Sequence, residues 1–333
     1  MIVENMETIH KTIRISRLVL CGLLITAGSL FSALAQTDYK LVEEPGCFMD
    51  VLLDGKPVAR YMTAYAPSSN PKDLTSTNKP YLHVFDPHGK TPITNSGTGG
   101  DHPHHRGIMI GWTKVTWNQK QYNFWGMYNN AQVHRGFSVK EANSQHAKFT
   151  SLVDWITHTG ETIIKEERTV VVQRADKPAY VNLDVISALQ ACRGDVFLDG
   201  DPEHAGVQFR AANEAERTAT FFAYPGEKTD PRKIVDPPWV AGQFNLGGKT
   251  YSVLQINHPA NPCGAKISAY RNYCRFGYFP APVTLTPDQP YILRYRFLVA
   301  DGKIPSAEWL QRACDAYTGN KGAAAPMTLC PAE

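Results

Sequence analysis

Short apolar stretches separated by tight-turn residues run through most of this chain and constrain what it can fold into. Asp54-Gly55 and Gly247-Gly248 each stand between two such stretches, and a four-residue polar segment separates a third pair. The three pairs join residues 51–53 to 58–61, 115–117 to 122–125, and 244–246 to 250–254. Asp-Gly and Gly-Gly dipeptides readily adopt the positive φ angles of two-residue hairpin turns. The sequence therefore predicts a succession of antiparallel hairpins.

Three longer segments alternate apolar and polar residues, over 162–173, 180–189 and 291–298. This period of two is typical of strands that bury one face, as strands of antiparallel sheets do. No shift in composition divides the chain, so one domain is expected over residues 36–318. The fold class that these patterns predict is all-β, a large antiparallel β-sandwich.

A single helix is predicted, over residues 307–317, near the C-terminus. Ser306 is placed to cap its start, and Thr318-Gly319 is placed to end it. The segment 319–333 is rich in Ala, Pro and Gly, and we expect it to be a loosely ordered tail unless Cys330 holds it.

Residues 1–35 have the organisation of a secretory signal peptide. Three basic residues precede an apolar run over 18–25, and Ala33-Leu34-Ala35 matches an Ala-x-Ala cleavage site. The apolar run is short for a membrane span of about 20 residues, so cleavage is favoured over an uncleaved anchor. We therefore expect a periplasmic or secreted protein with no membrane association after cleavage.

Charge and cysteine content bear on partners and on cross-links. The net charge of +3 comes without a basic stripe, which argues against a nucleic-acid partner and suits a carbohydrate or another small molecule. Six cysteines follow the signal segment, an even number that favours disulfides in an exported protein. The pairs closest in sequence are Cys263 with Cys274 and Cys314 with Cys330. The alternative is buried thiols, because a chain of this length needs no disulfide for stability.

The densest cluster of titratable residues is Asp101-His102-Pro103-His104-His105-Arg106-Gly107, with three of the eleven histidines. It lies between a glycine-containing loop and an apolar stretch, 108–112, that we predict to be a strand. In an extended conformation, His102 and His104 would share one face and His105 would point the other way. Imidazoles bind metals or transfer protons near neutral pH. The alternative is that these histidines cap the strand.

Further polar residues interrupt apolar stretches later in the chain, and with the histidine block they form the predicted site. The predicted catalytic residues are His102, His104, His134, His204, His258 and Arg106. The predicted substrate-binding residues are Trp112, Trp125, Arg135, Gln208, Arg210 and Asn261. If a divalent metal ion is the cofactor, its predicted ligands are His102, His104 and His204. Alternatively, Arg135 and Arg210 lie on sheet faces and pair with carboxylates such as Glu203 or Glu166.

Aromatic residues follow the histidine block closely. They are Trp112, Trp117, Tyr122, Phe124, Trp125 and Tyr128. Exposed aromatic faces stack on the C–H faces of sugar rings, which makes Trp125 and Trp112 the first candidates for a sugar platform. The alternative is that these side chains belong to the core, since alternation along a strand buries about half of them.

Several motifs together resemble one known family over roughly residues 40–318. They are Pro80-Tyr81-Leu82-His83, Gly100 to Gly107, Asn123-Phe124-Trp125-Gly126, Val133-His134-Arg135-Gly136, Glu203 to Arg210, and His258-Pro259-Ala260-Asn261-Pro262. The family is the exported bacterial group labelled "methane oxygenase PmoA-like". The label does not suit the chain, because the membrane oxygenase subunit is a bundle of transmembrane helices. The resemblance implies a role in sugar degradation and a β-supersandwich of the galactose-mutarotase type.

The residue types favour one class of chemistry over another. Hydrolysis of a glycoside usually needs two carboxylates, and Asp101, Glu166, Glu167 and Glu203 stand in no distinctive motif. Elimination from an oxidised sugar needs a base beside a carbonyl group and a cation to hold the enolate, which suits His and Arg. We therefore expect an exported lyase or hydrolase that acts on glycosides, including keto-modified ones. The alternatives are a sugar mutarotase or epimerase, and a non-catalytic glycan-binding protein.

Overall fold

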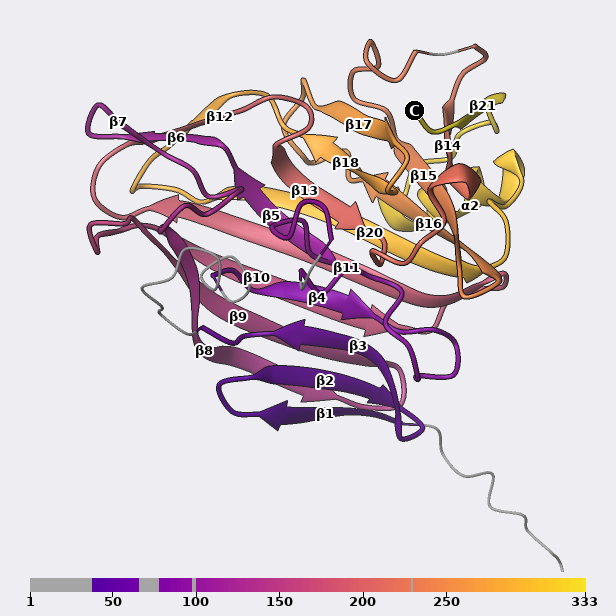
Figure 1. Ribbon diagram of the computed structural model, residues 1–333, viewed down its shortest axis with the longest axis horizontal. Helices are drawn as coiled ribbons and strands as arrows, with labels where there is room; N and C mark the ends of the chain where they lie inside the picture. Colours follow the sequence, from indigo (N-terminus) through magenta and orange to yellow (C-terminus); the bar gives the residue numbers. More distant parts are fainter. Residues whose placement is uncertain (1–37, 66–77, 98–99, 229) are drawn as a thin grey trace, which may run out of the picture. The chain divides into compact units, whose positions relative to one another are not determined.

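The computed structural model describes residues 38–65, 78–97, 100–228 and 230–333 (Figure 1). The expected signal peptide, residues 1–35, lies outside these ranges. Within the described ranges, no helix has the length and apolar character needed to cross a membrane.

The first of two large sheets has eight strands, all paired antiparallel. Their order is β1 (Tyr39–Glu44), β2 (Phe48–Leu53), β3 (Lys56–Met62), β4 (Tyr81–Val84), β5 (Ile108–Trp112), β13 (Ala205–Arg210), β18 (Arg275–Phe279) and β17 (Lys266–Arg271). The strand β13 comes from the middle of the chain and inserts between β5 and β18. This insertion brings residues near position 204 beside residues near position 112.

The second large sheet has nine strands, also antiparallel. Their order is β21 (Met327–Pro331), β14 (Phe221–Pro225), β15 (Trp239–Leu246), β16 (Lys249–Asn257), β20 (Tyr291–Asp301), β11 (Ala179–Ala191), β10 (Thr162–Gln173), β9 (His146–Ile156) and β8 (Ala131–Ala142). A small sheet of four strands has the order β19 (Val283–Leu285), β12 (Val196–Asp199), β6 (Lys114–Trp117) and β7 (Lys120–Tyr122).

The two large sheets pack face to face, and the main core lies between them. Trp112 on β5 contacts Trp155 on β9, with ring centroids 5.9 Å apart. Phe209 on β13 contacts Phe244 on β15, with ring centroids 6.1 Å apart. The burial of large apolar side chains from both inner faces is the principal favourable term for such a sandwich. The predicted all-β antiparallel sandwich is confirmed.

The predicted helix is confirmed as α2 (Ala307–Thr318), which covers the outer face of the second sheet. The Ser306 hydroxyl accepts a hydrogen bond from the backbone N–H of Trp309, and Gly319 ends the helix with a φ of 75°. Leu310 and Cys314 are its buried residues and pack against the sheet. This helix therefore closes a second, smaller core.

The predicted hairpins occur, and one of them differs in its turn. Asp54-Gly55 joins β2 to β3, and Gly247-Gly248 joins β15 to β16. The β6–β7 turn contains two residues, Asn118 and Gln119, where the sequence suggested four. Both have positive φ angles, 49° and 61°, as a two-residue hairpin of this kind requires. Because this turn is shorter than expected, β7 starts at Lys120 and ends at Tyr122, and Phe124 and Trp125 lie in the loop that follows.

The C-terminal segment differs from the loosely ordered tail that its composition suggested. Residues 327–331 form β21, which pairs with β14 from Phe221 to Pro225. Backbone hydrogen bonds to an edge strand supply an order that side-chain composition does not reveal.

The six cysteines of the described residues are free thiols, so both expected disulfides are wrong. Cys274 is buried in the main core, whereas Cys263 is exposed. Cys314 faces the core under α2, whereas Cys330 packs against the main core on the opposite face of the second sheet. Side chains on opposite faces of a sheet point apart and cannot be bridged without moving the backbone.

Candidate functional site

The histidine block between β4 and β5 forms a tight turn instead of an extended segment. The backbone N–H of His105 donates to the carbonyl of His102 over 2.9 Å, and His102 has a φ of 58°. The expectation that His105 points away from His102 and His104 is therefore wrong. A turn gathers residues i, i+2 and i+3 on one side, where a strand would place residue i+3 on the opposite face.

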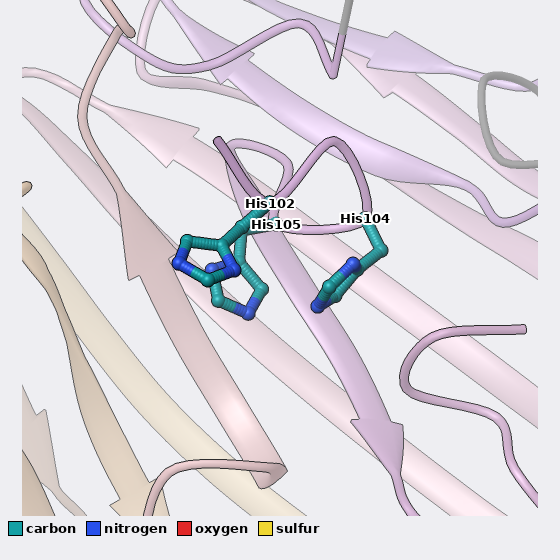
Figure 2. Close-up of side chains that lie close together, drawn as sticks. All are labelled: His102, His104 and His105. Carbon is teal, nitrogen blue, oxygen red and sulfur yellow. The ribbon is translucent and has the colours of Figure 1, made fainter. Parts of the chain in front are cut away.

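The three imidazole rings lie together on one side of this turn (Figure 2). One ring nitrogen from each of His102, His104 and His105 can be chosen so that all three lie within 4.8 Å of one another. The rings of His102 and His105 stack with centroids 5.0 Å apart, and those of His104 and His105 meet edge to face at 4.4 Å. The turn therefore creates a cluster from residues that are neighbours in sequence.

Residues at the end of the block fix the turn onto the sheet. Gly107 has a φ of 39°, and a Cβ atom there would lie 2.2 Å from the Leu82 carbonyl oxygen, so a side chain does not fit. The Asn95 side-chain amide donates to the carbonyl of His105 over 2.5 Å. Arg106 is fully buried, and its Nε atom donates to the Pro103 carbonyl over 3.2 Å. Arg106 therefore supports the turn from beneath, and the structure gives it no place on the pocket wall.

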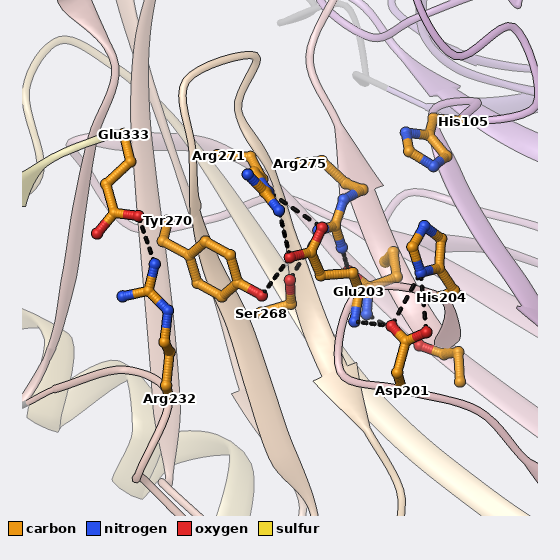
Figure 3. A network of polar contacts seen from close by, with 12 residues as sticks. His105, Asp201, Glu203, His204, Arg232, Ser268, Tyr270, Arg271, Arg275 and Glu333 are labelled. Atoms are coloured by element: carbon orange, nitrogen blue, oxygen red, sulfur yellow. Dashed lines mark hydrogen bonds and ion pairs between the residues drawn. The ribbon is translucent and has the colours of Figure 1, made fainter.

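A fourth histidine approaches from the loop that leads into β13. His204 Nδ1 lies 2.8 Å from Asp201 Oδ1 and 3.1 Å from Asp201 Oδ2 (Figure 3). The backbone N–H of Glu203 also donates to Asp201 Oδ1, over 2.9 Å, which holds the carboxylate in place. The His204 carbonyl accepts from the Thr113 N–H at the end of β5. Asp201 therefore orients the ring and leaves its Nε2 atom for other partners.

These histidines open onto a cavity of about 220 Å³, which we call the histidine pocket. Its lining residues are His102, His104, Thr113, Asn123, Trp125, Gly126, Tyr128 and His204. They come from the turn before β5, the residue after β5, the loop after β7 and the loop before β13. Three predicted catalytic residues, His102, His104 and His204, therefore meet in one pocket.

The predicted sugar platform is placed differently by the structure. Trp112 is buried in the main core and does not line the histidine pocket. Trp125 lines the pocket but is 1% exposed, and its indole Nε1–H donates to His105 Nε2 over 3.2 Å. Tyr128 is 72% exposed and lines the same pocket, so it is the aromatic residue whose face is open to a ligand.

Burial gives the histidine cluster its protonation state. Desolvation, with Lys79 as the next cause, lowers the pKa of His104 to about 3. Desolvation also lowers the pKa of His105 well below its usual value and lowers that of His102. These three imidazoles are therefore neutral at pH 7 and keep a nitrogen lone pair.

Lys79, two residues before β4, is a buried residue of the site that the sequence analysis missed. Its Nζ atom donates to the Trp125 carbonyl over 2.5 Å. Desolvation lowers its pKa well below the usual value, and the nearby charges of Arg106 and Arg168 act in the same direction. A lone lysine before a short strand carries no sequence signal of burial, because lysine is ordinarily exposed.

The carboxylates around the pocket are engaged by donors. Glu203 accepts from Tyr270 Oη over 2.7 Å and from Arg271 through both of its oxygens, at 2.6 and 3.0 Å (Figure 3). Asp101 pairs with Arg217 at 2.6 Å. Paired carboxylates stay ionised and make poor general acids, so the described residues near the histidines offer no pair suited to ordinary glycoside hydrolysis.

Two predicted substrate-binding residues lie beneath the site. Gln208 is buried, and its Oε1 atom accepts from Arg275 over 2.9 Å. Arg210 is buried as well, and it donates to the carbonyls of Ala211 and Tyr273 and to the Asn213 side chain. The Arg210 guanidinium lies 4.9 Å from the Tyr273 ring centroid, and the Tyr273 ring lies 5.2 Å from the ring of His102. Arg210 therefore supports Tyr273, a neighbour of the cluster that the sequence analysis missed.

The remaining predicted residues lie away from the histidine pocket. His134 on β8 has its Nδ1 atom 2.6 Å from the Ser151 hydroxyl and contacts Phe137. Arg135 forms an ion pair with Asp154 at 2.8 Å. This agrees with the alternative interpretation of Arg135 as a sheet-face arginine paired with a carboxylate, although the carboxylate is neither Glu203 nor Glu166.

His258 and Asn261 line a different cavity, beside α2. The Asn261 amide donates to Asn257 and to the Arg294 carbonyl, so it orders its own loop. His134 and His258 therefore lie on or next to different strands, and neither lines the histidine pocket. Their spacing along the chain does not reveal this separation.

Comparison with known proteins identifies one family and several solved structures with low similarity. Residues 49–314 match a family described as "Family of unknown function (DUF6807)". No curated protein matches the sequence. The predicted resemblance to the PmoA-like family is not addressed by these matches and stays a prediction.

Three solved structures are similar to parts of this chain. A variant of a glycoside hydrolase family 97 enzyme from a Pseudoalteromonas species is 11% identical, with a TM-score of 0.42 over 79% of this chain and 35% of that chain. A polysaccharide lyase is 10% identical, with a TM-score of 0.32 over 76% and 34%. A galactose mutarotase-like protein from Lactobacillus casei is 9% identical, with a TM-score of 0.31 over 79% and 100%. The chain spans about a third of the first two proteins.

Proposed function

The chain belongs to the DUF6807 family, and from the chemistry of the histidine pocket we propose that it is a carbohydrate-active enzyme that cleaves modified glycosides by elimination. The observation that carries this proposal is the convergence of His102, His104 and the Asp201–His204 pair on one pocket. The expected signal peptide supports a periplasmic or secreted location, which is part of the proposal.

The general base in this proposal is His204. Its Nδ1 atom is held by Asp201, so its Nε2 atom can accept a proton while Asp201 stabilises the imidazolium that forms. His102 and His104 lie across the same pocket and are neutral, which lets each donate or accept a hydrogen bond to a sugar hydroxyl.

Elimination suits this pocket better than hydrolysis. His204 removes a proton from the carbon next to a sugar carbonyl, and the C–H electron pair forms the double bond of an enolate. The enolate then expels the glycosidic oxygen from the neighbouring carbon, and that oxygen takes up the proton from His204. The step needs no oxidant and no water, and its products are an unsaturated keto-sugar and an alcohol. Because Asp101, Asp201 and Glu203 are all engaged by donors, the two-carboxylate route to hydrolysis is disfavoured.

The sugar platform in this proposal is Tyr128. Its side chain is 72% exposed at the pocket, whereas Trp112 and Trp125 are buried. An exposed aromatic face binds the apolar face of a sugar ring. The phenol therefore contributes to binding and leaves proton transfer to the histidines.

The test is a panel of chromogenic glycosides and of the same glycosides oxidised to their keto forms. We expect cleavage of the keto forms, with a product that absorbs as a conjugated enone, and a loss of rate on the order of 100-fold or more in His204→Ala. Tyr128→Ala should raise KM with little change in kcat.

Other outcomes of this panel distinguish the alternatives. Cleavage of unoxidised glycosides at equal rates would overturn elimination. Binding without turnover, retained in His204→Ala and lost in Tyr128→Ala, would make the protein a glycan-binding protein. A change of optical rotation without cleavage would indicate a mutarotase.

A further inference from the structure

The histidine cluster holds three ring nitrogens close together, in addition to the base His204 that the proposed elimination uses. His102, His104 and His105 present three ring nitrogens within 4.8 Å of one another. His204 lies in the same pocket, but its Nδ1 atom is occupied by Asp201. The ligand set predicted from the sequence contained His204, whereas the geometry gathers His105 in its place.

We infer that His102, His104 and His105 bind one divalent first-row transition metal ion of the zinc class, and that Trp125 competes with this ion for His105. Three neutral imidazoles are a donor set that zinc and cobalt favour. With bonds of about 2.1 Å, ligand nitrogens around a tetrahedral ion stand about 3.4 Å apart. The three nitrogens lie within 4.8 Å of one another, so reaching that spacing requires each to move by no more than about 1 Å.

An unpartnered buried nitrogen is independent support for a ligand at this position. His105 is 1% exposed, and its Nδ1 atom has no hydrogen-bond partner among the residues that the structure describes. A buried polar atom without a partner costs free energy, on the order of 1–3 kcal/mol. A metal ion on His105 Nδ1 would remove that cost.

The hydrogen bond from Trp125 to His105 is the interaction with which the metal ion would compete. An indole N–H can only donate, so His105 Nε2 must be the unprotonated nitrogen while this 3.2 Å bond exists. If the ion binds Nε2, the indole loses its acceptor. If the ion binds Nδ1, the proton of the neutral ring moves to Nε2, and two donors then face each other. Either way, a neutral His105 cannot keep the Trp125 bond and bind the ion.

The charges around the cluster indicate which kind of fourth ligand the ion would bind. The charges of Arg275 and Lys79 both lower the pKa of His105, and the charge of Arg210 lowers the pKa of His102. The negative charge of the Asp101 carboxylate raises the pKa of His102. Cationic surroundings disfavour a bare dication, so the fourth ligand would be an anion such as hydroxide or a substrate oxyanion.

The test measures ion binding without substrate. Chelator-treated protein is titrated with Zn²⁺ against a chromophoric chelator and with Co²⁺ by visible absorption. We expect one ion per chain, affinity weakened on the order of 100-fold in His104→Ala and in His105→Ala, and no change in His88→Ala, which removes an exposed histidine elsewhere. Trp125→Phe should bind about three- to tenfold more tightly, because it removes the competing donor.

Zn²⁺ should also shift one indole N–H resonance of the folded wild-type protein. This measurement needs no variant and covers the case in which Trp125→Phe does not fold.

Three results would overturn the inference. They are the absence of a stoichiometric ion, loss of the ion in His204→Ala but not in His105→Ala, and an unshifted set of indole resonances on saturation. Because no substrate is present, these results leave the proposed elimination to its own test. A metal-binding protein that cleaves no keto-glycoside would fail only the proposed function.

Discussion

Local backbone conformation decides what the histidine block can do. His102 adopts a positive φ of 58°, and the resulting turn brings the ring of His105, which an extended strand would have placed on the opposite face, to those of His102 and His104. Gly107 permits the close approach of the Leu82 carbonyl that anchors this turn to β4. The chemistry of the site therefore depends on two residues whose backbone, not side chain, is special.

At the residue scale, the pairing of Asp201 with His204 makes a kinetic prediction. Asp201→Asn keeps the shape but removes the charge that stabilises imidazolium, so kcat on a keto-glycoside should fall on the order of 100-fold. KM should stay within about threefold, because Asp201 does not line the pocket. The matched control is Asp195→Asn, an exposed aspartate in another loop, which should behave as wild type. Equal losses in both variants would remove Asp201 from the mechanism.

At the element scale, local signals specify hairpins and the helix, whereas sheet order comes from long-range pairing. The turn dipeptides Asp54-Gly55 and Gly247-Gly248 specify two hairpins, and the capping residues Ser306 and Gly319 specify the ends of α2. The insertion of β13 between β5 and β18 has no local signal, because any strand with a suitable face could pair there. That insertion brings the loop carrying His204 to the histidine turn.

The cap of α2 can be tested directly. The Ser306 hydroxyl accepts from the Trp309 N–H, so Ser306→Ala should lower the free energy of unfolding by about 1 kcal/mol. Ser306→Asp can make the same bond and should retain most of the wild-type stability. Denaturant titration of both variants measures the difference. Equal stability of wild type and Ser306→Ala would mean that tertiary packing alone holds the helix.

At the scale of the whole molecule, buried neutral histidines couple stability to pH. Burial, with the charge of Arg60 as the next cause, lowers the pKa of His83 to about 4. Burial also lowers the pKa of His134 to about 4. In an unfolded chain such histidines titrate near 6.5, so the unfolded state binds more protons between these two values. Their contribution to stability is therefore complete above about pH 6.5 and is lost as the pH falls toward 4.

For His83 alone this loss is on the order of 3 kcal/mol. Urea titrations between pH 7.5 and 4.5 should show the decline. His83→Asn, which can keep a polar contact with Thr94 but cannot be protonated in this range, should show a shallower one. The same pH dependence in His83→Asn and wild type would show that other groups govern acid unfolding.

The sequence by itself determined the class of fold, because period-two alternation and turn dipeptides are local properties that survive in any tertiary arrangement. It also located the histidine block, since residues adjacent in the chain stay adjacent in space. Tertiary structure alone decided that His204 joins His102 and His104, while His134 and His258 lie elsewhere. It also decided that Trp112, Arg106 and Lys79 are buried and that Lys79 donates a hydrogen bond to the Trp125 carbonyl. Strand order and sheet packing set these distances, and neither is encoded in the spacing of residues along the chain.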